Sequence, residues 1–241
     1  PVCGDKVIDM SNTYYNCFNI KGSPVCGNNV TNMSYTYYYC TNLTGSPVCG
    51  DNVIDMYQTY CYCYNLTGSP VCGDNVTGMR GAYYNCTNIT GSPVCGASVT
   101  NMRLAYYNCW KLTGKPVCGE NVIDMYRAYK FCSRITGSPV CGNKVTDMHE
   151  AYAQCKNITG LAVCGSNVTN MSFAYINCIN LSAGNQYWYS SKVSNVQACF
   201  SGKNNSRRYN IYVPENSTTF TTCLSNGQNS IVNAAITWTN A

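Results

Sequence analysis

The sequence is poor in charge, in histidine and in long apolar runs, and each shortage disfavours a class of protein. Charged residues make up 10% of the 241 residues, and the net charge of +5 is spread without a basic run, which disfavours nucleic-acid binding. No apolar run approaches the ~20 residues of a membrane-spanning helix, so we expect no membrane insertion. No signal peptide is present, and because Pro1 starts on a repeat unit we expect a mature or truncated chain.

Residues for catalysis and for cofactor binding are equally scarce. The single histidine, His149, occupies a position that varies between repeats, whereas nucleophilic catalysis needs a base beside the nucleophile. No glycine-rich phosphate loop follows a strand, and the cysteines form no CxxC pairs of the kind that bind zinc. The sequence therefore predicts a protein that is not an enzyme and that holds neither a cofactor nor a metal.

What the chain has in abundance is a repeat of 23 residues. The unit PVCGDNVTGMRGAYYNCTNITGS at residues 70–92 recurs without insertion or deletion. The eight copies, numbered here as coils 1 to 8, begin at Pro1, Pro24, Pro47, Pro70, Pro93, Pro116, Pro139 and Ala162. A fixed period in this range predicts a solenoid, in which each coil buries its apolar face against its neighbours.

The apolar positions of one unit predict a short strand and a short helical turn in each coil. From Met79 the spacing runs to Tyr83 and Cys86, at i, i+4 and i+7, which is typical of one face of a helix. Residues 89–94 favour an extended segment, which Pro93 shortens because proline cannot donate to a strand ladder. The inward side chains are expected to be Val30, Met33, Tyr37, Cys40 and Leu43 and their equivalents in the other coils.

Sixteen of the nineteen cysteines form two columns, with one cysteine of each column in every coil. This regularity predicts one disulfide per coil and an oxidising compartment. A row of buried free thiols is the alternative, because unpaired cysteine packs as a small hydrophobic residue. The bond would span nine residues, as from Cys17 to Cys26, or fourteen, as from Cys3 to Cys17. The shorter span is favoured slightly, because the segment between is extended and can return across the coil edge.

The disulfide candidates include one further pair, in the C-terminal region. They are Cys17, Cys26, Cys40, Cys49, Cys63, Cys72, Cys86, Cys95, Cys109, Cys118, Cys132, Cys141, Cys155, Cys164, Cys199 and Cys223. Cys61 belongs to neither column, so we expect it to be free or to link two chains.

Units such as CTNLTGSPVCGDNVIDMYQTYCYC resemble the BspA-like leucine-rich repeats, whose coil runs C-x-x-L…I-P-x-x-V-T-x-I…A-F-x-x-C. Leu43, Val48, Val53, Met56 and Tyr60 stand in matching roles. The resemblance covers residues 1 to about 184, and the later segment NIYVPENSTTFTTC looks like the terminal cap of that family. It implies an α/β solenoid: a leucine-rich-repeat-like, right-handed stack of eight 23-residue coils, each a short strand plus a short helical turn, with a C-terminal α/β cap.

The repeat fails after Gly184, so the sequence predicts two parts. Residues 1–184 are expected to form the eight-coil repeat solenoid, and residues 185–241 a C-terminal capping region that covers the last open coil. Within this region residues 209–213 and 236–238 are apolar, and residues 215–224 carry capping residues suited to a short helix. A disulfide between Cys199 and Cys223 is expected to hold the capping region together.

Acids such as Asp9, Asp55, Asp124 and Asp147 occupy the residue before methionine and alternate with Asn32, Asn101 and Asn170 in an Asp/Asn column. Stacked carboxylates suit calcium, but residues of this type more often cap the turn that follows, which is the interpretation we favour. The repeat also generates many N-x-S/T sequons, so their number is no independent evidence for glycans.

The positions that vary between coils give the strongest signal for function. They are the two residues after methionine, the two before the second-column cysteine and the one after it, and many carry large aromatics. Tyrosine, asparagine and tryptophan with some arginine are typical of recognition surfaces, and lateral stacking of the tyrosines along the rod is the alternative. The candidate ligand-binding residues are Tyr35, Tyr57, Tyr64, Arg80, Arg103, Trp110, Tyr126, Arg127 and Phe173.

Together these features predict a non-enzymatic extracellular solenoid for recognition or adhesion. The resemblance implies display on a bacterial cell surface or a phage virion, with a Tyr/Asn-rich face that binds a protein or glycan receptor. A homo-oligomer is possible through the repeat face or through Cys61. The alternative is a structural spacer, fibre or virion decoration protein with no specific ligand.

Overall fold

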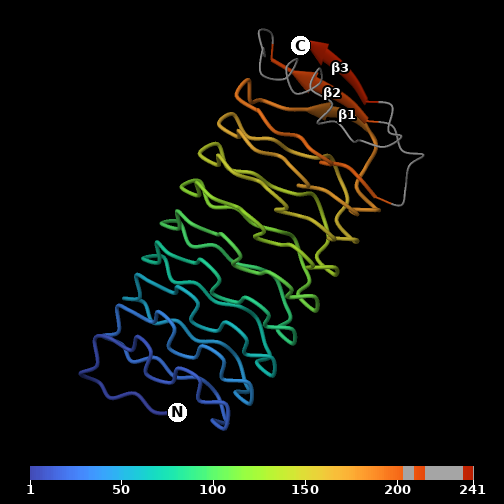
Figure 1. Cartoon of the computed structure of the whole chain (residues 1–241). Helices are drawn as coiled ribbons and strands as arrows, with labels where there is room; N and C mark the ends of the chain where they lie inside the picture. The colour runs from blue at the N-terminus through green and yellow to red at the C-terminus, as the bar shows by residue number, and fades with distance from the viewer. Residues whose placement is uncertain (203–208, 215–235, 241) are drawn as a thin grey trace.

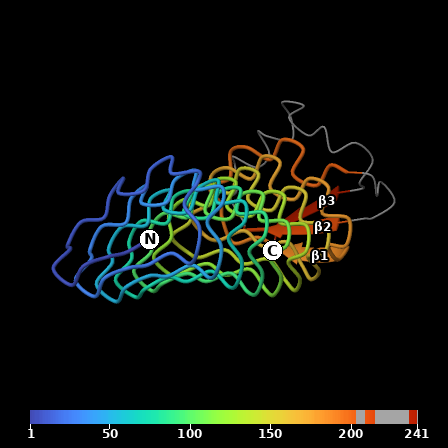
Figure 2. The same ribbon diagram turned by 90° about the horizontal axis from the view of Figure 1, so that it is seen from below.

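The chain forms a stack of coils in the computed structural model, which describes residues 1–202, 209–214 and 236–240. Figure 1 shows successive coils placed one above another along a single axis, from the blue N-terminal coil to the orange and red C-terminal end. Parallel bridges join equivalent residues of neighbouring coils, beginning with Asp9 and Asn32 and ending with Asn170 and Asn195. In the turned view the coils overlap as loops of similar outline (Figure 2). Residues one repeat apart therefore lie side by side.

Backbone hydrogen bonds hold neighbouring coils in register. In coil 1 the amide N–H of Asn12 donates to the carbonyl of Ser34 at 3.0 Å, and that of Tyr14 donates to the carbonyl of Thr36 at 2.9 Å. The same pattern recurs in every later coil pair, as in the bond from Tyr106 to Ala128. These bonds pair the polar groups that burial between coils would otherwise leave unsatisfied.

The helical turn expected after each methionine is wrong. The described residues contain no helix, and two β-turns occupy the segment instead. In coil 5 the first turn covers residues 102–105: the N–H of Ala105 donates to the carbonyl of Met102 at 2.9 Å, and Leu104 has a φ of 59°. The second turn covers residues 106–109 and has the same arrangement. A positive φ at the second central residue defines a type II turn and is incompatible with an α-helix. Two successive turns bury the same i, i+4 and i+7 positions as a helix, so the apolar spacing could not separate them.

The core is a set of columns that run along the stack. Val30, Met33, Tyr37, Cys40 and Leu43 are all 0% exposed, which confirms the predicted inward positions. Equivalent tyrosine rings stack from coil to coil, for example Tyr37 on Tyr60 with centroids 5.5 Å apart. Offset stacking of this kind adds to the apolar burial, which is the main stabilising contribution in the stack.

The ladder of coils continues past residue 184, where the sequence analysis ended the repeat. The N–H of Tyr175 donates to the carbonyl of Cys199 at 2.9 Å, and the ring of Phe200 stacks on Tyr175 at 5.7 Å. Residues 193–200, VSNVQACF, thus stand over residues 168–175, VTNMSFAY, as a ninth coil. The offset is 25 residues instead of 23, and these two extra residues broke the period in the sequence.

A small parallel sheet lies at the C-terminal end of the stack (Figure 1). It contains β1 (Gly184–Tyr187), β2 (Tyr209–Val213) and β3 (Ile236–Asn240), in the order β1-β2-β3. Gln186 pairs with Ile211, and Ile211 pairs with Trp238. The two apolar segments noted in the sequence are therefore strands β2 and β3. The helix expected over residues 215–224 and the cysteine at 223 lie outside the described residues.

Candidate recognition surface

The paired β-turns place a defined set of side chains on one surface of the stack. From coil 2 onward the first and last residues of each turn are buried, as are Met125 and Ala128, whereas the central residues Tyr126 and Arg127 keep part of their surface exposed. The residue after the second-column cysteine joins them, as at Trp110. We call this surface the turn face; it comprises positions 103, 104, 107, 108 and 110 and their equivalents in the other coils.

The turn face holds all nine predicted ligand-binding residues, and none of them is buried. Three of the nine form one contact group at coils 2 to 4. The Tyr35 and Tyr57 rings meet edge to face with centroids 4.8 Å apart, and the guanidinium carbon of Arg80 lies 5.6 Å from the Tyr57 centroid. A hydrogen bond with Tyr57 and partial burial raise the pKa of Tyr35 to about 12, so this phenol is neutral at physiological pH.

Four more of the nine form a second group at coils 5 to 8. The guanidinium carbon of Arg103 lies 3.8 Å from the ring centroid of Tyr126, and that of Arg127 lies 4.8 Å from the same centroid. Phe173 joins through His149, whose ring stacks on Tyr126 at 5.0 Å and meets Phe173 edge to face at 5.8 Å. Cation–π contacts of this kind hold both charge and ring area in fixed positions.

Tyr64 and Trp110 lie apart from these two groups, in the row after the second-column cysteine. Tyr64 contacts Tyr62 with centroids 6.1 Å apart. Trp110 is 37% exposed, and two cations flank its ring: Lys111 Nζ at 5.2 Å and the guanidinium carbon of Arg134 at 5.3 Å. The structure thus divides the nine predicted residues between separate clusters on one face.

A further row of aromatic side chains runs along the turn face between these clusters, and none of its residues was among the nine predicted ones. Its rings make a continuous series of contacts from coil 1 to coil 6, with centroid distances between 4.7 and 5.8 Å. The rings are those of Tyr15, Tyr38, Tyr62, Tyr84, Tyr107 and Phe131. Burial raises the pKa of Tyr84 to about 12. The sequence signal was available, because these are the varying positions just before the second-column cysteine.

Positive charge concentrates on the turn face between coils 4 and 6. Its four cationic side chains there are Arg80, Arg103, Arg127 and Lys130, and two more cations, Lys111 and Arg134, lie at its edge, one residue beyond the row of Trp110. Two carboxylates partly offset them: Asp124 lies 3.7 Å from Arg103, and Glu150 accepts hydrogen bonds from both Arg127 and Lys130. Burial alone would raise the pKa of Glu150, but these two bonds hold it below its usual value. The cations outnumber the carboxylates, and the aromatic surface of coils 1 to 3 beside them carries no charge.

The Asp/Asn column caps the β-turns, as the favoured interpretation predicted, although the turn is not helical. The Oδ1 atom of Asp55 accepts a hydrogen bond from the N–H of Tyr57 at 2.8 Å, and that of Asp124 accepts one from Tyr126 at 2.7 Å. Residues 1–202, 209–214 and 236–240 contain no group of three or more side chains placed to hold a metal ion. The column therefore caps the first turn of each coil except coil 4, where Gly78 has no side chain to accept the bond.

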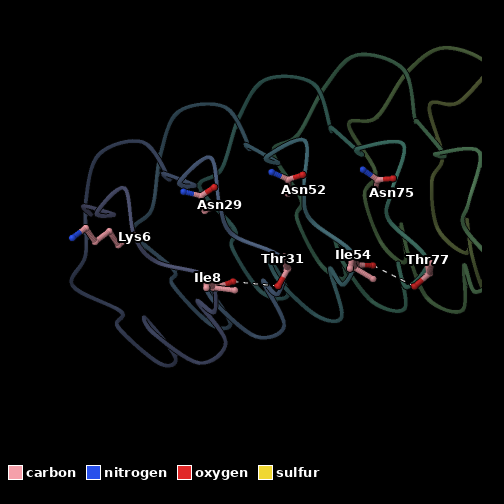
Figure 3. Close-up of a pocket in the computed structure, with 8 residues that line it drawn as sticks. All are labelled: Lys6, Ile8, Asn29, Thr31, Asn52, Ile54, Asn75 and Thr77. Carbon is pink, nitrogen blue, oxygen red and sulfur yellow. Dashed lines mark hydrogen bonds between the residues drawn. The ribbon is translucent and has the colours of Figure 1, made fainter.

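A shallow groove crosses coils 1 to 4 away from the aromatic clusters (Figure 3). One wall is a row of asparagines whose amide groups donate to the preceding coil, as Asn52 Nδ2 does to the carbonyl of Asn28 at 2.9 Å. The other wall alternates isoleucine and threonine, and Thr77 Oγ1 donates to the carbonyl of Ile54 at 3.3 Å. Each of these amide groups thus has one of its N–H donors engaged with the backbone of the preceding coil, and the groove contains no aromatic side chain.

The expected disulfide in each coil is absent from the described part of the chain. All eighteen cysteines there are free thiols, which agrees with the alternative of unpaired cysteines. In the second column each thiol is engaged elsewhere: Cys86 Sγ donates to the carbonyl of Tyr60 at 2.9 Å, and Cys109 Sγ to that of Tyr83. The prediction of a Cys199–Cys223 bond involves a residue outside the described ranges.

Cys61 cannot link two chains in this fold. Its side chain is 1% exposed, and burial raises the pKa of its thiol to about 12. The side chain fills the position that Tyr38 and Tyr84 occupy in the adjacent coils, beneath the aromatic rows. Of the two alternatives expected for this residue, the structure agrees with the free thiol.

Comparison with known proteins gives a family match for part of the chain. Residues 123–230 match the family described as "Mycoplasma protein of unknown function, DUF285". No curated protein and no solved structure matches the chain. The family description assigns no activity, and the resemblance to BspA-like repeats remains a prediction. In the part that the structure describes, no helix is long and apolar enough to cross a membrane.

Proposed function

We propose that the protein is a non-enzymatic recognition solenoid, which acts outside the cytoplasm and binds a protein or glycan receptor through the turn face. The setting we propose is a bacterial surface or a phage particle. The matching family is described as a Mycoplasma family, which favours the bacterial setting. The turn face is well suited to binding because short hydrogen-bonded turns hold its aromatic and basic side chains on a rigid backbone.

The observation that carries this proposal is the arrangement around Trp110. A stack of coils needs no exposed tryptophan for its stability, yet Trp110 is 37% exposed between Lys111 and Arg134. Tryptophan and arginine are the residues most enriched at the energetic centres of interfaces. The exposed part of the Trp110 ring provides apolar contact area, and the two cations beside it provide donors for an anionic group.

The charge of the turn face favours an acidic partner. Its cations between coils 4 and 6 outnumber its carboxylates, so a receptor that carries carboxylates, sulfates or acidic side chains would be attracted at long range. The uncharged tyrosines of coils 1 to 3 then provide adjacent contact area. A receptor along this face would span several coils.

The experiment is a comparison of binding to arrays that carry neutral, sialylated and sulfated glycans and to intact cells. We expect the wild-type protein to bind a subset of anionic ligands, with affinity that falls as salt is raised. Trp110→Ala combined with Arg134→Gln should reduce binding at least tenfold. The control is Ile54→Ala with Thr77→Ala in the groove of Figure 3, which should bind as the wild type does. Equal binding by both variants would contradict the proposal.

The alternative function is a spacer, fibre or virion decoration protein. The observation that favours it is the continuous aromatic row from Tyr15 to Phe131, because rings that contact each other along the stack are partly occupied in stabilising it. A spacer would show no binding to any array or cell, and the Trp110 variant would leave attachment of its parent cell or particle unchanged.

A further inference from the structure

The first-column cysteines form a row along one side of the stack. We call it the outer cysteine row, and it consists of Cys3, Cys26, Cys49, Cys72, Cys95, Cys118, Cys141 and Cys164. All of them except Cys164 are only half-buried, in contrast to the second column, which is buried from coil 2 onward. Small reagents in solvent can therefore reach the outer row.

Each thiol of the row lies against the next coil. A Cβ atom added to Gly119 would stand 3.1 Å from Cys95 Sγ, and one added to Gly165 would stand 3.1 Å from Cys141 Sγ. The N–H of Gly142 donates to Cys118 Sγ at 3.3 Å. The glycine after each cysteine lets the coils approach closely, and it places the sulfur of one coil beside the residue that follows the next cysteine.

The spacing between coils suits a bond between neighbours in the row. Parallel strands in register lie about 4.8 Å apart, and disulfides form between residues whose Cα atoms are about 4.4–6.8 Å apart. Bridges in the Asp/Asn column hold the coils in register from Asp9 to Asn195. At the row itself the backbones also approach closely, because a Cβ atom added to Gly119 would stand 3.3 Å from the carbonyl oxygen of Gly96, the residue after Cys95. Within a coil, by contrast, the second-column thiol already donates to a carbonyl of the preceding coil, as Cys132 Sγ does to Tyr106 at 2.9 Å.

We propose that the outer cysteine row is an oxidation site, at which cysteines of neighbouring coils form disulfides along the stack. Each bond joins residues 23 apart in the sequence, such as Cys118 and Cys141, and none joins the two columns. Because a thiol takes part in one bond only, the eight cysteines of the row form at most four disulfides.

The reaction is thiol–disulfide exchange with a small disulfide oxidant such as oxidised glutathione. One thiol loses its proton and attacks the oxidant, which forms a mixed disulfide and releases one glutathione thiol. The thiolate of the neighbouring coil then attacks the mixed disulfide, forms the bond between coils and releases the second glutathione thiol. Burial raises the pKa of Cys118 to about 11 and that of Cys141 to about 12, so the exchange is slow at neutral pH and faster in mild alkali.

Disulfides along the outer cysteine row would change how the stack unfolds. In a repeat protein each coil contacts only its neighbours, so unfolding can begin at an end and proceed one coil at a time. A disulfide between two coils makes them open together. The row would therefore make the protein more resistant to unfolding in an oxidising compartment than in a reducing one.

The test uses a variant in which only one disulfide can form at the centre of the outer cysteine row. Cys95→Ser with Cys164→Ser leaves Cys118 and Cys141 as each other's only neighbours. The folded variant is oxidised with oxidised glutathione at mildly alkaline pH, alkylated, digested with trypsin without reduction and analysed by mass spectrometry. Cys118 lies in peptide 112–127, Cys132 in 131–134 and Cys141 in 135–144, so each possible bond gives a different linked pair.

We expect peptides 112–127 and 135–144 to be linked, and the thermal midpoint of the oxidised variant to rise above that of the reduced one. Adding Cys141→Ser should abolish the link and leave Cys118 open to alkylation. A link from peptide 131–134 to either of the other two would overturn the proposal, and so would a link from peptide 104–111, which holds Cys109, to peptide 112–127. Free Cys118 and Cys141 after complete exposure to the oxidant would overturn it as well. If the variant does not fold, the same digest of the oxidised wild-type protein decides: Cys118 linked to Cys95 or Cys141 supports the proposal, and Cys118 linked to Cys132 overturns it.

Discussion

The hydroxyl of Tyr83 makes two hydrogen bonds to one residue, Val71. It donates to the Val71 carbonyl at 2.7 Å and accepts from the Val71 N–H at 3.0 Å. Val71 follows Pro70, and proline keeps this part of the coil out of a regular strand ladder. The buried tyrosine column thus satisfies the backbone that the proline leaves unpaired, and the same pair of bonds recurs in the other coils, as between Tyr106 and Val94.

We expect Tyr83→Phe to destabilise the protein by about 2 kcal/mol, because it leaves a largely buried N–H and a carbonyl without partners. The matched control is Tyr14→Phe, which removes the same two bonds in coil 1. Val2 is 82% exposed there, so water can replace the hydroxyl and the cost should be small. Urea unfolding of both variants measures the difference. Equal losses would show that the hydroxyl does not satisfy the coil backbone.

The methionine column should tolerate a change of shape but not a charge. Met79 is 0% exposed, so Met79→Asp places an unpaired carboxylate in an apolar core and should cost about 3 kcal/mol or more. Met79→Leu keeps nearly the same volume and should cost less than about 1.5 kcal/mol. Thermal unfolding compares the two. A Met79→Asp variant as stable as Met79→Leu would disprove the buried position of this column.

The protein should lose stability in alkali well before its lysines titrate. Burial raises the pKa of the Cys63 and Cys86 thiols and of the Tyr83 and Tyr106 phenols far above their usual values. These groups stay protonated in the folded chain but ionise in the unfolded chain from pH about 8.5 for cysteine and about 10 for tyrosine. The contribution of each group to the free energy of unfolding is therefore complete below the pKa that the group has in the unfolded chain. Above that pKa the contribution falls by about 1.4 kcal/mol per pH unit.

Urea midpoints measured under reducing conditions from pH 7 to pH 10.5 test this. The midpoint should stay constant to pH about 8 and then fall with increasing slope. A midpoint that does not change between pH 8 and 10.5 would mean that the second cysteine column and the tyrosine column are not buried in the native state.

The inward positions of the coil could be predicted from the sequence, but the local backbone could not. Met102, Tyr106 and Cys109 follow a spacing that a helix and two β-turns bury equally well. The deciding feature is the positive φ at Leu104 and Asn108, and leucine gives no sign of it. The local signs of a turn were Gly81 in coil 4, with a φ of 63°, and the asparagines at positions such as Asn108, because glycine and asparagine adopt positive φ more readily than other residues.

The cysteine pattern shows a second limit. Two regular columns are compatible with disulfides within a coil, disulfides between coils and free thiols, because sequence spacing does not say which sulfurs face each other. The structure resolves this through contacts such as Cys109 Sγ with the Tyr83 carbonyl. For the candidate surface, variation between coils selected side chains that are not buried, and the role of the nine residues in binding stays a prediction. The variation did not indicate how Lys111 and Arg134 flank Trp110.

The most direct test of the central claim measures binding and stability on one variant of the turn face. The variant changes six aromatic residues to alanine: Tyr35, Tyr57, Tyr64, Trp110, Tyr126 and Phe173. These positions hold Ser, Arg, Thr or Lys in other coils, so each change should cost about 0.5 kcal/mol or less, whereas an aromatic anchor of an interface is worth about 2 kcal/mol or more. The account predicts a folded protein with a slightly lower thermal midpoint that no longer binds the ligands or cells recognised by the wild type. A folded variant whose binding is unchanged would contradict the account. If binding is retained and the thermal midpoint falls strongly, in proportion to the number of rings removed, the aromatic residues only stabilise the stack.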